Sequence, residues 1–226
     1  MPQRGFVLIE VAIALLVLAL ILGGILAPLN AQVEQGKISE TNKVISDINE
    51  ALLGFVMING RLPRPATSST NGVESAACAS EAACTGFIPW TTLGSGKLDA
   101  WGNIIRYSVT PAFANAAFAL TTVGTKTIQE RNTASALVSY ATLVPVVVWS
   151  NGPQNFGTNG TGAVRANNSS SVTNADEITN NTASTTFIRR PLVNNSAATG
   201  GEFDDIVTFI PTAILVNKAI AAGKLP

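Results

Sequence analysis

The feature that most constrains the fold is an apolar run from Phe6 to Pro28, which only Glu10 interrupts. It reads FVLIEVAIALLVLALILGGILAP. A helix of about 20 apolar residues is long enough to cross a hydrocarbon layer of about 30 Å. Arg4 precedes the run, and a positive charge there favours an N-terminus on the cytoplasmic side. The run therefore predicts one membrane-spanning helix over residues 6–30.

Two simpler interpretations of this run stay open, a secretory signal peptide and a plain membrane anchor. The run is longer than the apolar stretch of about 7–15 residues in a signal peptide. A cleavage site after Ala31 would place Leu29 where a small residue is preferred. An anchor explains the length of the run but not Glu10, because a carboxylate in hydrocarbon costs about 2.5–3.5 kcal/mol. The acid therefore indicates a role beyond anchoring.

The composition argues against an enzyme and against a nucleic-acid-binding protein. The chain has no histidine, which removes the commonest general acid–base residue and most zinc chemistry. Its 14 Lys and Arg residues balance 14 Asp and Glu residues, whereas nucleic-acid binding usually needs a clustered basic surface. We therefore expect a structural or binding protein without catalytic residues.

The residues Gly5-Phe6-Val7-Leu8-Ile9-Glu10, followed by the apolar run, resemble the prepilin leader of type IV pilins and type II secretion pseudopilins. The resemblance implies that a prepilin peptidase removes a leader peptide, residues 1–5, by cutting between Gly5 and Phe6. The new N-terminus at Phe6 would then be N-methylated. It also implies that Glu10 pairs with the free N-terminus of a neighbouring subunit during filament assembly.

This resemblance carries further expectations about location and partners. The chain would lie in a bacterial inner membrane as a single-pass protein with its N-terminus in the cytoplasm, and then in a periplasmic or extracellular filament. Its partners would be copies of itself, the prepilin peptidase, an inner-membrane assembly platform and, before assembly, the membrane. The alternative is a membrane-anchored periplasmic binding module that does not polymerise. A pilus and a type II secretion pseudopilus both remain open.

The pattern over residues 31–60 predicts an amphipathic continuation of the helix. Apolar residues and one threonine recur every three or four positions, which is the spacing of one helix face: Ile38, Thr41, Ile45, Ile48, Leu52 and Phe55. Gly60 suits the position after the helix end, and Pro63 prevents the helix from resuming. We expect this face to pack on a sheet of the globular head, residues 61–226.

The first part of the head, residues 61–97, is rich in Pro, Gly, Ser, Thr and Ala and is predicted to be a loop. It contains Cys78 and Cys84, the two cysteines of the chain. In an exported head such a pair indicates a disulfide, and two buried free thiols are the alternative.

Four segments of the head have strand patterns, and the chain closes with an apolar helix that starts after Pro211. The predicted strands are residues 103–110, 118–123, 143–150 and 203–210. Residues 157–201 form a long polar insertion. The predicted fold class is therefore α+β and pilin-like, with one long N-terminal helix packed on a small antiparallel sheet.

A second, weaker resemblance to pseudopilins lies in Asp99-Ala100-Trp101-Gly102-Asn103, and in Ser150-Asn151-Gly152 followed later by Asp204-Asp205-Ile206-Val207. In type II secretion major pseudopilins the last two elements hold a calcium ion. Here the loop after Gly152 lacks an acid, and two neighbouring aspartates on a strand would point to opposite faces. We therefore expect no cofactor and assign no metal, with Asp204 and Asp205 as weak calcium candidates. We interpret the Asp99 segment as a structural turn with a core tryptophan.

Overall fold

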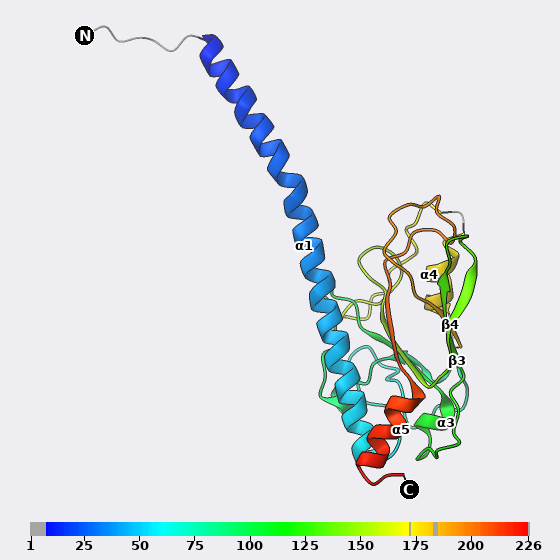
Figure 1. Ribbon diagram of the computed structural model, residues 1–226. Helices are drawn as coiled ribbons and strands as arrows, with labels where there is room; N and C mark the ends of the chain where they lie inside the picture. The colour runs from blue at the N-terminus through cyan, green and yellow to red at the C-terminus, as the bar shows by residue number, and fades with distance from the viewer. Residues whose placement is uncertain (1–7, 172, 183–184, 226) are drawn as a thin grey trace. The chain divides into compact units, whose positions relative to one another are not determined.

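The computed structural model describes residues 8–171, 173–182 and 185–225. The chain divides into two compact units, Met1–Glu40 and Thr41–Pro226. Helix α1, Leu8–Asn59, runs through the first unit and into the second (Figure 1). It ends where Gly60 adopts a φ of 67° and donates its N–H to the carbonyl of Val56 at 2.8 Å. Glycine adopts this left-handed conformation without strain, so the predicted helix end is confirmed.

The prediction of a membrane-spanning helix is corrected by the structure. Among the residues that it describes, none of the helices combines the length and the apolar character that a membrane span requires. The predicted single-pass location in a bacterial inner membrane is therefore not supported.

The predicted helix face in the second unit packs into the main hydrophobic core. Ile45, Ile48 and Leu52 are fully buried there. Val56 completes this face, whereas the predicted Phe55 is only half-buried. The buried face therefore follows the predicted helical period, except that Val56 takes the last position in place of the predicted Phe55.

A four-stranded antiparallel sheet covers this helix face. Its strand order is β1-β2-β5-β7, and the strands are β1 Thr85–Phe87, β2 Arg106–Val109, β5 Val146–Ser150 and β7 Ile206–Ile210. The closing helix α5, Thr212–Ala221, buries Leu215 and Ala219 in the same core. Two short helices, α2 Trp90–Leu93 and α3 Pro111–Ala114, lie in the connections.

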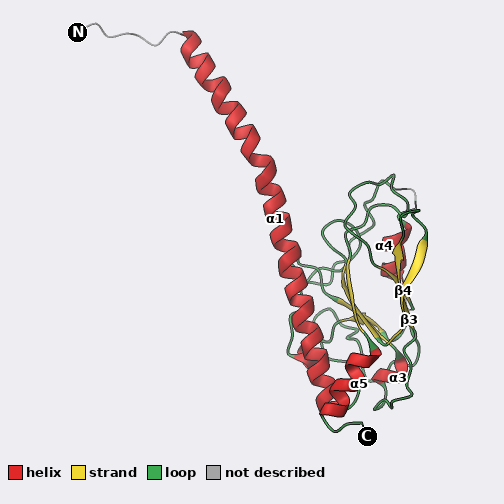
Figure 2. Cartoon of the chain, in the orientation of Figure 1, coloured by secondary structure: helices red, strands yellow, loops and turns green. Residues whose placement is uncertain are grey.

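The protein is α+β, as predicted, but the finer prediction of one long apolar N-terminal helix packed on one small antiparallel sheet is wrong, because the described residues contain no helix apolar enough for a membrane span and the head has a second sheet. Its order is β4-β3-β6, with β3 Lys126–Arg131, β4 Leu137–Val144 and β6 Thr186–Ile188. β3 pairs with β6 in parallel. Figure 2 shows the strands in yellow, with β3 and β4 labelled. The segment 118–123 is not a strand, and the polar insertion contains both β6 and helix α4, Ala175–Thr182.

Pro145 explains why the predicted strand 143–150 became two strands. Proline has no N–H to donate to a sheet ladder, and Leu143 beside it adopts a positive φ of 56°. The apolar run is therefore interrupted here, so that β4 pairs in the second sheet and β5 in the first.

The two sheets face each other through β5. Its residues alternate between two cores, with Val146 and Val148 in the helix-side core and Val147 and Trp149 between the sheets. Trp149 contacts Phe187 of β6 with 5.1 Å between ring centroids. A strand buried on both faces is apolar at nearly every position, which accounts for the sequence VVVWS.

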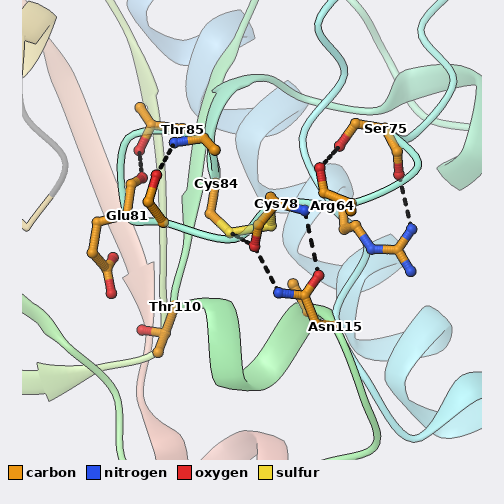
Figure 3. The surroundings of a disulfide bond; sticks show 12 residues. Arg64, Ser75, Cys78, Glu81, Cys84, Thr85, Thr110 and Asn115 are labelled. Carbon is orange, nitrogen blue, oxygen red and sulfur yellow. Dashed lines mark hydrogen bonds between the residues drawn. A yellow bond between two sulfur atoms is a disulfide. The ribbon is translucent and has the colours of Figure 1, made fainter.

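The predicted disulfide between Cys78 and Cys84 is confirmed (Figure 3). Asn115 holds the loop between these cysteines, because its Nδ2 donates to the carbonyl of Cys78 at 2.6 Å. Cys84 lies directly before β1, so the bridge fixes the start of an edge strand of the first sheet. The region 61–97 was predicted to be a loop, but it also contains β1 and α2.

Candidate functional site

The most unusual feature of the head is a buried cluster of three carboxylates, Glu177, Asp204 and Asp205. One oxygen from each lies within 4.8 Å of the others. Glu177 is fully buried, and each aspartate is 4% exposed. Isolated buried carboxylates are costly, so a cluster of three needs protons, hydrogen-bond donors or a cation.

The local structure brings these residues together in a way that the sequence did not predict. Asp204 and Asp205 lie directly before β7, which begins at Ile206. The alternation of side chains along a strand therefore does not separate them. Glu177 comes from the first turn of α4 in the polar insertion. The one available signal for it was that Asp176 and Glu177 are the only acids in residues 157–201.

Side-chain amides surround the cluster. Glu177 accepts hydrogen bonds from Nδ2 of Asn155 at 2.9 Å and Nδ2 of Asn174 at 2.7 Å. Its other oxygen accepts from the backbone N–H of Asp204 at 2.8 Å. Asp205 accepts from Nδ2 of Asn180 at 2.7 Å. The Asn-rich insertion thus supplies the site with neutral hydrogen-bond donors, Asn174 and Asn180, and also with one of its acids, Glu177.

Some buried oxygen atoms at the cluster have no hydrogen bond to any described residue. Oδ2 of Asp204 accepts from the backbone N–H of Gln154 at 2.7 Å. Oδ1 of Asp204 and Oδ1 of Asn151 are buried without a partner among the described residues. Asn151 lies beside the cluster, since its Nδ2 is 3.5 Å from Oδ1 of Asp205.

Burial and mutual repulsion shift the protonation of both aspartates. Burial, together with the charges of Glu177 and Asp205, raises the pKa of Asp204 to about 9. Burial also raises the pKa of Asp205 to about 8, although hydrogen bonds from Asn180 and Asn151 oppose the shift. At neutral pH the site therefore resists carrying its full negative charge without a compensating cation.

The donor set fits a hard divalent cation such as calcium. Calcium takes six to eight oxygen ligands from carboxylates, amide carbonyls, backbone carbonyls and waters. The three carboxylates, which include the unpartnered Oδ1 of Asp204, and the amide Oδ1 of Asn151 provide oxygens of this kind within the described residues. The ligand count from the sequence was low because it did not include Glu177.

The Asp99 segment forms the predicted turn. Oδ1 of Asp99 accepts the backbone N–H groups of Trp101 at 3.0 Å and Asn103 at 2.8 Å. Its Oδ2 accepts from the hydroxyl of Ser150 at 2.6 Å, and Nδ2 of Asn103 donates to the carbonyl of Gly152 at 2.7 Å. Burial raises the pKa of Asp99, and these hydrogen bonds oppose that shift. Trp101 is only half-buried, so the expectation of a core tryptophan is wrong.

The turn therefore joins the two segments that carry the second resemblance. Asp99 and Asn103 hold the Ser150-Asn151-Gly152 segment in place. This segment contributes Asn151 to the edge of the carboxylate cluster. The two segments act together as structural support for one site.

The predicted processing and assembly residues lie at the N-terminal end of the chain. Gly5 and Phe6 are outside the described residues. Glu10 lies in the first turn of α1. The side chains around it are exposed, with 86% exposure for Leu8 and 61% for Leu16. The structure thus contains a second candidate functional surface, the exposed apolar segment Leu8–Leu20 of α1.

Comparison with known proteins adds no further assignment. No protein-family model, curated protein or solved structure matches this chain.

Proposed function

We propose that the chain is a structural subunit of the pilin or pseudopilin type, which polymerises through its N-terminal helix into a filament. The observation that carries the proposal is the exposed apolar segment Leu8–Leu20. Contiguous exposed apolar surface of this extent is typical of an interaction site. The same apolar segment on another copy of the chain is a partner that could cover this apolar surface.

Burial between copies would stabilise such an assembly. Each fully buried leucine side chain contributes about 1.5–3 kcal/mol relative to an exposed one. Leu8, Leu15 and Leu20 are each more than half exposed. A contact that joins different surfaces of successive copies produces an open helical filament when the rotation between copies does not close into a ring.

The N-terminal motif supports the same proposal through its resemblance to prepilins. Cleavage by a prepilin peptidase between Gly5 and Phe6 would expose an amine at Phe6, and an assembly platform would add subunits. Glu10 would pair with the Phe6 amine of a neighbouring copy. This pairing would set the register between apolar helices that otherwise slide easily past one another.

A second proposal concerns the head, where the carboxylate cluster binds a divalent cation as a structural element. The supporting observation is the unpartnered Oδ1 of Asp204 between two further buried acids, within the described residues. Glu177, Asp204 and Asp205 would hold the ion. A bound cation would connect the polar insertion to β7 and make the head more rigid.

The filament proposal is tested by adding one charge at two matched positions. Leu16→Glu changes the proposed interface, whereas Val164→Glu places the same charge on a head residue that is 79% exposed. We expect filaments from the wild type and from Val164→Glu, and few or none from Leu16→Glu, by negative-stain microscopy. Abundant Leu16→Glu filaments would exclude this helix as the interface. A chain that stays monomeric in sedimentation, even after processing, would favour the non-polymerising binding module.

A further inference from the structure

A cavity of about 390 Å³ in the head is lined by Glu130, Arg131, Arg189, Arg190 and Pro191. The parallel pairing of β3 with β6 creates it, because the carboxyl ends of both strands lie at the same edge of the sheet. Glu130 and Arg131 end β3, and Arg189 and Arg190 directly follow β6. The backbone N–H of Arg189 donates to the carbonyl of Gln129 at 2.9 Å, which fixes this register.

Two of the three arginines already have a structural partner. Arg131 binds Asp176 of α4 through Nε at 2.7 Å and through a terminal nitrogen at 2.6 Å. Arg190 reaches the same carboxylate at 2.8 Å. Asp176 is almost completely buried, so these contacts fasten α4 to the second sheet. Asp176 is thus shared between two guanidinium groups.

Arg189 is the arginine with the weakest and most exposed partner. A terminal nitrogen of Arg189 forms a loose ion pair with Oε1 of Glu130 at 3.6 Å, which is too long for a hydrogen bond. The side chain of Arg189 is 45% exposed, and its guanidinium carbon lies 5.1 Å from the ring centroid of Tyr140. The aromatic ring orients the group while leaving its hydrogen-bond donors accessible.

The residues that line the cavity carry a net positive charge, with three arginines and the one carboxylate of Glu130. Behind this lining, the charges of Asp176 and Glu177 also act on Arg190. The side chain of Arg190 is only 6% exposed, and its Nε has no hydrogen-bond partner among the described residues. Burial lowers the pKa of Arg190, with the charge of Asp176 opposing the shift. An incoming anion would therefore bind to the exposed guanidinium of Arg189 at the positively charged lining.

We propose that this cavity is a binding site for the oxyanion of a small ligand, a carboxylate or a sulfate ester. The planar fork of Arg189 matches both groups. The volume is in the range of small-molecule sites and exceeds what a bare ion needs. A ligand of the size of one sugar acid fits these requirements. This inference does not depend on whether the chain forms filaments.

The test measures binding to the full chain by saturation-transfer NMR, with glucuronate and glucose 6-sulfate as probes and glucose as the uncharged control. We expect both anions to bind and glucose not to bind, and the response to fall with added salt. The carboxylate and sulfate probes show which oxyanion the site prefers. Absence of binding by both anions, or equal binding of glucose, would overturn the proposal.

Three variants distinguish a defined site from general charge attraction. Arg189→Gln should weaken binding about tenfold, because a charge-assisted hydrogen bond is lost. Glu130→Gln should strengthen it, because the competing carboxylate is removed. Lys218→Gln removes a positive charge from an exposed side chain on α5 and should leave binding unchanged. Equal losses in Arg189→Gln and Lys218→Gln would show unspecific attraction and refute the site. Thermal melts of each variant confirm that the head is folded.

Discussion

At the scale of single residues, Asp204 decides what the carboxylate cluster can do. It has one oxygen that accepts from the Gln154 amide and one buried oxygen without a partner among the described residues. Its neighbours Glu177 and Asp205 are both acids, and their charges help to raise its pKa to about 9. Such an arrangement is unfavourable alone and favourable around a cation.

We expect Asp204→Asn to have opposite effects with and without calcium. In buffer with a metal chelator the variant should be at least as stable as the wild type, because the substitution removes one carboxylate from the cluster. In calcium at about a hundred times its dissociation constant, the wild type should gain about 2.7 kcal/mol and the variant much less. Thermal melts of the full chain in both buffers measure this, with Glu202→Gln as the control. Identical shifts in wild type and Asp204→Asn would contradict the cation site.

At the scale of elements, the disulfide and β1 form one local unit. Cys84 directly precedes β1, and Phe87 at the end of β1 exchanges backbone hydrogen bonds with Ala66. The bridge closes a short loop with a separation of 6 residues. Its effect on global stability should therefore be modest, whereas its effect on the sheet edge should be clear.

Replacing both cysteines by alanine should destabilise the head by on the order of 2–3 kcal/mol, which combines loop entropy with lost core volume. Amide hydrogen exchange should accelerate in β1 and in residues 61–97. The central strand β5 should keep its protection, because it is paired on both sides. Hydrogen exchange with mass spectrometry measures the difference. Uniform acceleration across β1 and β5 would show that the bridge supports the whole head instead.

At the scale of the whole molecule, assembly and head stability should be separable. Glu10 belongs to the unit Met1–Glu40, and the main core belongs to the unit Thr41–Pro226. Glu10→Val should therefore leave the melting temperature of the head unchanged. In a filament it would leave the neighbouring Phe6 ammonium without its proposed counter-charge, a penalty on the order of 3–5 kcal/mol per contact.

The expected result is processed Glu10→Val protein at normal levels and few filaments. Immunoblots of processed subunit and filament counts by negative-stain microscopy measure the two quantities in parallel. Glu40→Val removes an exposed acid from the same helix and should assemble normally. Abundant filaments from Glu10→Val alone would contradict the pairing with Phe6, and loss of the processed protein would place the defect in folding.

Local patterns in the sequence determined those parts of the fold that depend on neighbouring residues. The helical period identified Ile45, Ile48 and Leu52 as core residues, because side chains three or four positions apart share a helix face. Gly60 marked the helix end through its backbone freedom. The two cysteines had one possible intramolecular partner each, and the bridge formed between them.

Only the tertiary structure decided the second sheet and the carboxylate cluster. The parallel pairing of β3 with β6 joins segments that are far apart in sequence. Strand β6 has only three residues, Thr186–Ile188, which is too short for a strand pattern to be recognised in the sequence. Glu177 reaches Asp204 and Asp205 because Arg131 and Arg190 hold the preceding Asp176 against the sheet. The periodicity of the sequence indicates which face of a helix or strand a residue occupies. Long-range contacts determine which other element packs against that face. The sequence by itself therefore determined the amphipathic part of α1, the closing helix α5 and the central strands β2 and β5. Packing between distant segments determined the site.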